Sequence, residues 1–155
     1  HPVERMMSTN QKTRNSLSEF IKEKCGSDLR NIIFIPPESN INSYMLMELA
    51  DLGLVYSSTT GLEMALKNKP VIVAGNPHYI GTEFVYSPET KEEYLELLSQ
   101  PLSPLPNQVE FAERYAYMYF VEHMVPFDDI IRQVGYDYRF VDDIEKSTIL
   151  KRGGF

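Results

Sequence analysis

The organisation of the chain is set by one stretch, Tyr56-Ser57-Ser58-Thr59-Thr60-Gly61-Leu62-Glu63. An apolar run at 54–56 leads into it and reads as a strand, and apolar residues at 62, 65 and 66 have the spacing of one helix face. A strand that ends in small hydroxyl residues and turns directly into a helix forms an anion site. The first N–H groups of the helix have no internal partner there, and the helix dipole adds positive charge. The stretch therefore predicts a site for a phosphate or diphosphate group.

Each residue type in the stretch suits such a site. The hydroxyl groups of residues 57–60 add hydrogen-bond donors, and Gly61 lets a ligand approach the backbone closely. A purely structural interpretation fits the spacing equally well, because residues 60–63 also spell a capping box, with Thr60 as N-cap and Glu63 reaching back. The stretch is neither a Walker loop nor a G-x-G-x-x-G fingerprint, so it gives no support to those two mechanisms.

Composition limits the classes of function. The 155 residues suit one domain of usual size, and the apolar content of 43% is ordinary. The net charge of −7 argues against a nucleic-acid interface, which needs clustered Lys and Arg. No apolar run is long enough to span a bilayer, so no transmembrane segment is predicted. The single cysteine, Cys25, cannot form an internal disulfide, which favours a reducing compartment, and we expect it to be buried or half-buried near a helix end.

Strands and helices alternate along the first hundred residues. Apolar runs predict strands at 32–35, 54–56, 71–74 and 84–86. Helices are predicted from Ser16 to a stop at Gly26, from Asn40 or Asn42 to Leu49, from Gly61 to Asn68, and from Ser87 onward with an inner face of Tyr94, Leu95 and Leu98. This alternation calls for right-handed crossovers and a parallel sheet covered by helices on both sides, and hence for an α/β fold.

Two segments of the predicted sheet converge on one crevice. In parallel sheets, ligands bind beyond the carboxyl ends of the strands. Ser57 and Ser58 follow one predicted strand, and residues 75–78 follow the next. This convergence favours a binding site at the turn over a simple helix cap. His78 lies on the rim of the crevice, where it either contacts the ligand or packs as an ordinary surface residue.

The last third of the chain adds helices. Residues 101–106 form a proline-rich connector, and Asn107 with Glu110 starts a helix whose aromatic stripe we interpret as packing. A short helix through Ile131 is predicted after it, and from residue 135 the chain is expected to run over the surface or onto a neighbouring domain.

The predicted organisation is a single domain with two parts. Residues 1–100 form the core with the predicted phosphate site, and residues 101–155 form the connector with C-terminal helices that pack on it. The chain starts with His1 and not with methionine. We therefore expect it to be a piece of a longer protein whose upstream part is missing.

Four segments together resemble a known family: residues 50–52, 57–63 and 69–73, with the pair His1-Pro2. They are similar to the carboxyl-terminal half of glycosyltransferases with two facing Rossmann-like domains, the GT-B fold. Within that group they look most like the capsule polysaccharide biosynthesis proteins, which carry a Ser-Thr-x-Gly-Leu-Glu segment before a Lys-Pro-Val strand and include transferases that use CMP-activated keto sugars. The His-Pro pair is also similar to that of bacterial sialyltransferases. The resemblance covers about residues 30–100 and the first two residues, and it does not extend into the last third.

The resemblance implies a Rossmann-like parallel sheet flanked by helices, one half of a GT-B fold, with extra C-terminal helices. It implies that residues 1–100 are a nucleotide-sugar-binding core. The nucleotide sugars that such a core binds include CMP-linked ones. His1 would contact the donor phosphate and assist departure of the nucleotide. The phosphate would be held by Ser57 and Ser58 together with the backbone N–H groups of Thr59, Thr60 and Gly61. Glu63 would reach the ribose hydroxyls, and His78 would lie beside them.

The reaction implied is transfer of a sugar to a hydroxyl of a glycan or lipid-linked acceptor, in the cytoplasm or at the inner face of the membrane. The donor half stabilises charge on the leaving phosphate, while the catalytic base belongs to an amino-terminal domain. We therefore expect this chain to be inactive alone. No metal-ligand spacing is seen, so metal independence is predicted, with no cofactor besides the nucleotide-sugar substrate. Two alternatives stay open: a donor domain like that of UDP-sugar epimerases, and a non-catalytic module that binds a nucleotide or a protein.

Overall fold

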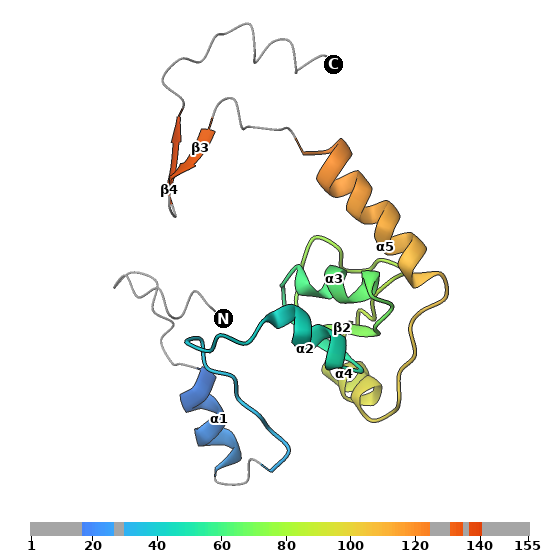
Figure 1. Cartoon of the computed structure of the whole chain (residues 1–155). Helices are drawn as coiled ribbons and strands as arrows, with labels where there is room; N and C mark the ends of the chain where they lie inside the picture. The colour runs from blue at the N-terminus through green and yellow to red at the C-terminus, as the bar shows by residue number, and fades with distance from the viewer. Residues whose placement is uncertain (1–16, 27–29, 125–130, 135–136, 141–155) are drawn as a thin grey trace, which may run out of the picture. The chain divides into compact units, whose positions relative to one another are not determined.

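Short helices and short strands make up the part of the chain that the computed structural model describes, which is residues 17–26, 30–124, 131–134 and 137–140 (Figure 1). The chain divides into two units, residues 1–49 and residues 50–155.

The first unit contains two helices, α1 (Leu17–Cys25) and α2 (Ser43–Leu49). Gly26 ends α1 with a positive φ of 60°, and its N–H donates to the carbonyl of Lys22 over 3.0 Å, so the predicted stop is confirmed. Asn42 is the residue that caps α2, because its Oδ1 accepts from the N–H of Tyr44 over 2.8 Å.

Two expectations for this unit are wrong. The apolar run at 32–35 is not a strand, and the side chain of Ile33 is 91% exposed. An extended segment becomes a strand only when its backbone pairs with a neighbour. The two regular elements described in this unit are both helices, so they offer no such edge. Cys25 is exposed, because it lies at the last position of α1, a helix without buried residues.

The second unit is built on a small parallel sheet. β1 (Gly53–Val55) pairs with β2 (Val71–Val73), and Gly53 lies opposite Val71. Helix α3 (Thr60–Leu66) connects the two strands. Tyr86 extends the sheet by a single parallel bridge, in which its N–H donates to Val71 over 2.8 Å and its carbonyl accepts from Val73 over 2.9 Å. The α/β class is therefore confirmed, although the predicted strand at 84–86 is reduced to this bridge.

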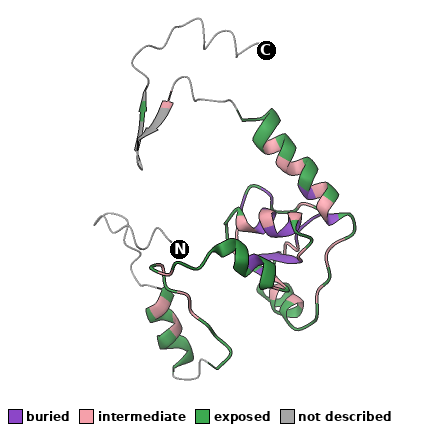
Figure 2. Cartoon of the chain, in the orientation of Figure 1, coloured by how far each residue is buried: buried purple, intermediate pink, exposed green. Residues whose placement is uncertain are grey.

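The core of this unit lies between β2 and α3 (Figure 2). All three residues of β2 are fully buried, whereas in β1 only Gly53 is buried. A Cβ atom at Gly53 would be 2.6 Å from the sulfur of Met64, so the glycine is needed for close packing of α3 on the strand. The other buried hydrophobic residues of the unit come from α3, from the loop after β2 and from α5, and they are Leu62, Met64, Ala65, Tyr79, Phe84, Val85 and Ala112.

Helix α4 (Lys91–Leu98) begins later than predicted. Its N-cap is Thr90, whose side chain accepts from the N–H of Glu93 over 3.2 Å. Of the predicted inner face, Tyr94 is half-buried, but Leu95 and Leu98 are exposed. Helical spacing allows more than one stripe of apolar residues, and the packing partner decides which stripe faces inward.

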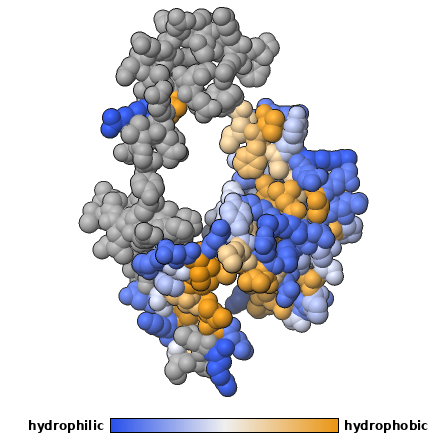
Figure 3. All heavy atoms as spheres, in the orientation of Figure 1, coloured by the Kyte–Doolittle hydropathy of each residue, from blue (hydrophilic) through white to orange (hydrophobic). Residues whose placement is uncertain are grey.

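Helix α5 (Gln108–Tyr117) continues into a π-helix, η2 (Met118–Glu122). Asn107 precedes it in the left-handed region with φ of 56°, so the predicted start is confirmed, but Asn107 makes no side-chain cap. Glu110 instead forms an ion pair with Arg114 at 2.6 Å, one turn further along. Helix α5 packs on α3, and apolar side chains stay exposed toward the end of the helical segment (Figures 1 and 3).

Gln108 is the one polar residue among the buried residues of the described chain, with 1% of its surface exposed. Its Oε1 accepts from the N–H of Leu105 over 3.0 Å. Its Nε2 donates to the carbonyl of Ala65 over 3.2 Å and to that of Lys69 over 2.9 Å. The Ala65 carbonyl also accepts from the N–H of Asn68 over 3.0 Å, so this side chain adds a second donor at the end of α3. It joins the connector, α3 and α5 at one point.

Near its end the described chain forms a hairpin. β3 (Ile131–Val134) pairs antiparallel with β4 (Asp137–Phe140), and Ile131 lies opposite Phe140. Ile131 is therefore in a strand and not at the end of a helix, and the rest of that predicted helix, at 125–130, lies outside the described residues. Within the described chain, every helix is too short or too polar to cross a bilayer.

Gln108→Ala is expected to lower the free energy of unfolding by about 2 kcal/mol or more, because a buried polar group that loses its partner costs about 1–3 kcal/mol. Urea unfolding followed by circular dichroism measures this. The matched control is Gln100→Ala, at an exposed position, which should change the free energy by about 0.5 kcal/mol or less. Equal losses in the two variants would contradict a special role for the buried amide.

Candidate functional site

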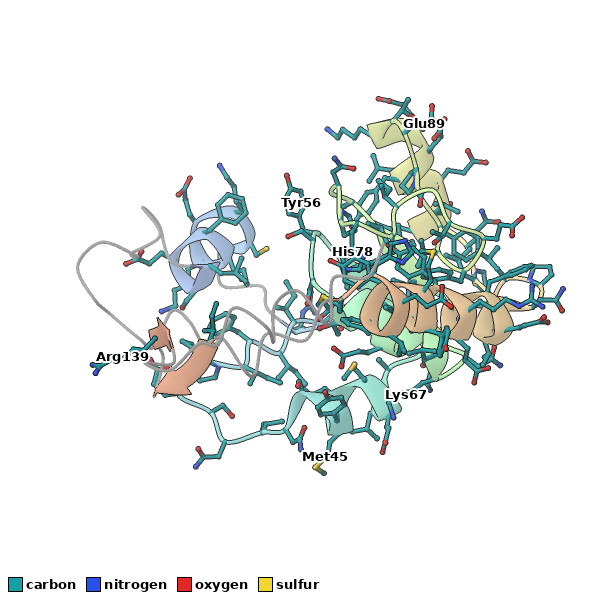
Figure 4. All side chains as sticks on the ribbon, turned by 90° about the horizontal axis from the view of Figure 1, so that it is seen from above. Met45, Tyr56, Lys67, His78, Glu89 and Arg139 are labelled. Carbon is teal, nitrogen blue, oxygen red and sulfur yellow. The ribbon has the colours of Figure 1, made fainter. Side chains whose placement is uncertain are left out.

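The hydroxyl turn, residues 57–60, lies at the carboxyl end of β1. Ser57, Ser58 and Thr59 are exposed and Thr60 is half-buried. Tyr56, just before the turn, is 74% exposed and projects away from the ribbon (Figure 4). The turn therefore presents its polar groups at the surface, directly after a strand of the parallel sheet.

The capping box predicted from Thr60 and Glu63 does not form, because the N-cap of α3 makes no side-chain capping hydrogen bond. Thr59 is the N-cap of α3 and Thr60 is its first residue. The Ser58 hydroxyl accepts from the N–H of Thr60 over 3.2 Å and lies 2.8 Å from the Thr60 hydroxyl. The Thr59 hydroxyl donates to Oε1 of Glu63 over 3.3 Å. Glu63 thus reaches back to the Thr59 side chain and does not cap Thr60, whose N–H already donates to the Ser58 hydroxyl.

Several backbone N–H groups of the turn already have partners. In addition to Thr60, the N–H of Gly61 donates to the Ser58 carbonyl over 3.3 Å, and that of Glu63 donates to the Thr59 carbonyl over 3.1 Å. A ligand at this turn therefore meets the hydroxyl groups first. When the Thr60 hydroxyl donates to the Ser58 oxygen, the Ser58 proton is available to an incoming acceptor.

Tyr79 contacts the backbone of the hydroxyl turn from the protein interior. Its side chain is fully buried, and its hydroxyl donates to the Ser58 carbonyl. A Cβ atom at Gly61 would overlap that hydroxyl and would lie 3.0 Å from Cγ2 of Val55. We expected Gly61 to admit a ligand, and the structure shows that it admits the Tyr79 hydroxyl. Burial raises the pKa of Tyr79, and the Gly61 N–H opposes this to a smaller extent, so the hydroxyl keeps its proton and donates.

The loop after β2 meets the turn, as predicted. The N–H of Ala74 donates to the Val55 carbonyl over 2.8 Å, one position beyond the paired strands. Gly75 packs so closely on the Tyr56 carbonyl that a Cβ atom there would overlap it. Through these contacts and Tyr79, residues 75–79 and the hydroxyl turn form one continuous edge of the sheet.

His78 is exposed at this edge and is held by aromatic residues of α5 and η2 (Figure 4). Its Nδ1 is 2.8 Å from the hydroxyl of Tyr115, which also donates to the His78 carbonyl over 2.8 Å. Its ring stacks on Tyr119 with centroids 4.1 Å apart and an interplanar angle of 8°. These contacts show that His78 packs against aromatic residues, which was one of the two expectations for it. The residue is nevertheless exposed, so a ligand can also reach it.

His1 lies outside the described residues, so its expected role stays a prediction. Among the residues that the structure describes, no three His, Cys, Asp or Glu side chains gather as metal ligands. The sequence reasoning missed Tyr79 and Tyr115, because the contact that defines each of them joins segments 21 or 37 positions apart. An open depression of about 310 Å³ lies beside Tyr115, and its lining includes Phe84, Phe111 and Met118.

Gly61→Ala is expected to destabilise the fold by about 1–3 kcal/mol, the usual cost of overpacking a core. In the background Tyr79→Phe the same change should cost less, because the oxygen that the new methyl group meets is absent. A double-mutant cycle of urea unfolding measures this coupling. Additive effects would show that the glycine and the tyrosine hydroxyl do not compete for the same space.

Comparison with protein-family models, with curated proteins and with solved structures gives no match for this chain.

Proposed function

We propose that the chain is the donor-binding half of a nucleotide-sugar-dependent glycosyltransferase of capsule or surface polysaccharide biosynthesis. The observation that supports this most is the meeting of the hydroxyl turn with residues 75–79 at the carboxyl edge of the β1–β2 pair. Ligands of α/β proteins bind at this edge of the sheet. The resemblance of residues 50–73 to the family's donor half supplies the class of ligand, a nucleotide sugar.

In this proposal, side-chain hydroxyl groups bind the donor phosphate. Ser57 and Ser58 are exposed and donate to the phosphate oxygens, while Thr60 supports Ser58 from 2.8 Å away. The partial positive charge at the start of α3 adds to the attraction, because the turn leads directly into the helix. Phosphate oxygens only accept hydrogen bonds, so a surface of hydroxyl donors suits them.

Glu63 binds the ribose in this proposal. It is half-buried, and its Oε1 accepts from the Thr59 hydroxyl over 3.3 Å. That contact orients the carboxylate so that Oε2 accepts from a ribose hydroxyl. The contact with Thr59 and ribose binding are therefore compatible, and Thr59 positions the carboxylate for the ribose.

The chemical contribution of this half is stabilisation of the departing nucleotide. Negative charge grows on the phosphate as the bond to the sugar breaks, and donors held in place before the reaction stabilise that charge. Tyr79 contributes by fixing the backbone of the turn through the Ser58 carbonyl. The acceptor is a hydroxyl of a glycan or lipid-linked sugar, which needs a base to remove its proton.

Calorimetric titration of the chain with CMP, CDP, UMP, UDP and GDP tests the proposal. We expect CMP to bind, and we expect Ser58→Ala to weaken its binding about tenfold, which corresponds to about 1.4 kcal/mol. The matched control is Ser99→Ala, since Ser99 lies at the end of α4 and its hydroxyl donates only locally, to the Glu96 carbonyl over 2.7 Å.

The other outcomes separate the alternatives. A preference for UDP would favour a UDP-sugar transferase or an epimerase-like donor domain. Binding that is equally strong in Ser58→Ala would place the nucleotide away from the hydroxyl turn. Failure of all five nucleotides to bind, with the fold intact by circular dichroism, would contradict the proposal for this chain and leave the turn as a helix start.

A further inference from the structure

Two hydrogen bonds of one hydroxyl group decide the tautomer of His78. The Tyr115 hydroxyl lies 2.8 Å from the His78 carbonyl and 2.8 Å from Nδ1 of the same residue. A phenol has one proton, and a carbonyl oxygen can only accept. The proton of Tyr115 therefore points at the carbonyl, and the phenol oxygen accepts from Nδ1. The neutral imidazole then carries its hydrogen on Nδ1, and Nε2 has a free lone pair.

The surroundings keep this arrangement in place. The His78 ring stacks on the Tyr119 ring with centroids 4.1 Å apart, and the Tyr79 ring is nearly perpendicular to it, at 5.2 Å and 85°. Tyr115 also stacks nearly parallel to it, at 5.8 Å and 13°. Burial raises the pKa of Tyr115, and the neighbouring Tyr119 adds to the shift, so the phenol keeps the proton on which the arrangement depends. Three aromatic rings thus restrict rotation of the imidazole.

His78 is close to the hydroxyl turn as well. The Tyr79 ring, which is 5.2 Å from the His78 ring, places its own hydroxyl on the Ser58 carbonyl. One tyrosine side chain therefore separates the imidazole from the turn.

We propose that Tyr115 is a positioning residue for His78: it fixes the imidazole in the Nδ1–H form and so presents Nε2 as a hydrogen-bond acceptor to a hydroxyl group of the ligand. A neutral Nε2 cannot donate to a phosphate, which has only acceptor oxygens, but it suits the hydroxyl groups of ribose or of the transferred sugar. The identity of the ligand rests on the proposed function. The tautomer and its dependence on Tyr115 stand on the geometry alone.

Nitrogen-15 NMR of the imidazole tests the tautomer, because protonated and unprotonated ring nitrogens resonate far apart. The three histidines are assigned with His78→Gln and His123→Gln. When the ring is neutral, wild-type His78 should show a hydrogen on Nδ1, and Tyr115→Phe should shift the population toward Nε2–H. Tyr117→Phe is the matched control, since it changes an exposed tyrosine of the same helix and should leave His78 unaltered.

His123 is an internal reference, because its Nδ1 is 2.9 Å from the Met118 carbonyl and should remain Nδ1–H in both tyrosine variants. A wild-type spectrum with Nε2–H, or an unchanged His78 spectrum in folded Tyr115→Phe, would overturn the proposal. If Tyr115→Phe does not fold, the wild-type spectrum still decides which nitrogen carries the hydrogen.

Addition of CMP tests the second part. The Nε2 signal of His78 should move on binding, and His78→Asn, whose shorter amide still reaches Tyr115 but offers no group at the position of Nε2, should weaken CMP binding about tenfold. CMP binding that leaves both unchanged would overturn the role of Nε2. Absence of CMP binding would count against the proposed function, while the tautomer would still be decided by the first experiment.

Discussion

The side-chain amide of Gln108 is the interaction on which the second unit depends. One buried group bonds to the connector, to the last turn of α3 and to the segment that leads into β2. Because α3 forms the wall of the core and carries the hydroxyl turn at its other end, the amide fixes the helix that positions the site. The chain turns just before Gln108, at Asn107, whose φ is 56°. A polar residue in such a place is favourable only because both ends of its amide are paired.

The elements that the sequence predicts well are those whose signals are local. Alternating apolar runs and helix boundaries predicted β1, α3, β2 and the α/β class, and glycine and asparagine predicted the end of α1 and the start of α2. The run at 32–35 was misread because the same composition suits a buried strand and an exposed extended segment, and pairing alone tells them apart. The hairpin at 131–140 was missed because each of its strands has only four residues, too few for a periodic pattern to stand out.

The same distinction applies to the candidate site. The hydroxyl turn and the loop at 75–78 could be predicted, since both follow apolar runs and the carboxyl ends of parallel strands share one edge. The roles of Tyr79 and Tyr115 could not be predicted. The sequence shows that one tyrosine lies in a loop and the other in a helical stripe, but it does not show which distant carbonyl each hydroxyl contacts. Both tyrosines act through a single hydroxyl on a backbone carbonyl, at Ser58 and at His78. The aromatic stripe was interpreted as packing, and this interpretation holds for Tyr115 and Tyr119 but not for Met118, which is exposed. The same two tyrosines orient the histidine at the site edge.

The bond between Gln108 and Ala65 spans 43 positions of the chain, and this has a consequence for biosynthesis. A ribosome adds about 5–20 residues per second, so α3 leaves the ribosome seconds before Gln108 does. During that interval the helix lacks its hydrogen bond from α5, and Ala112 is not yet present to cover the core. The nascent second unit is therefore open to chaperones until α5 has emerged, and synonymous codons that slow translation between residues 70 and 108 would prolong that exposure.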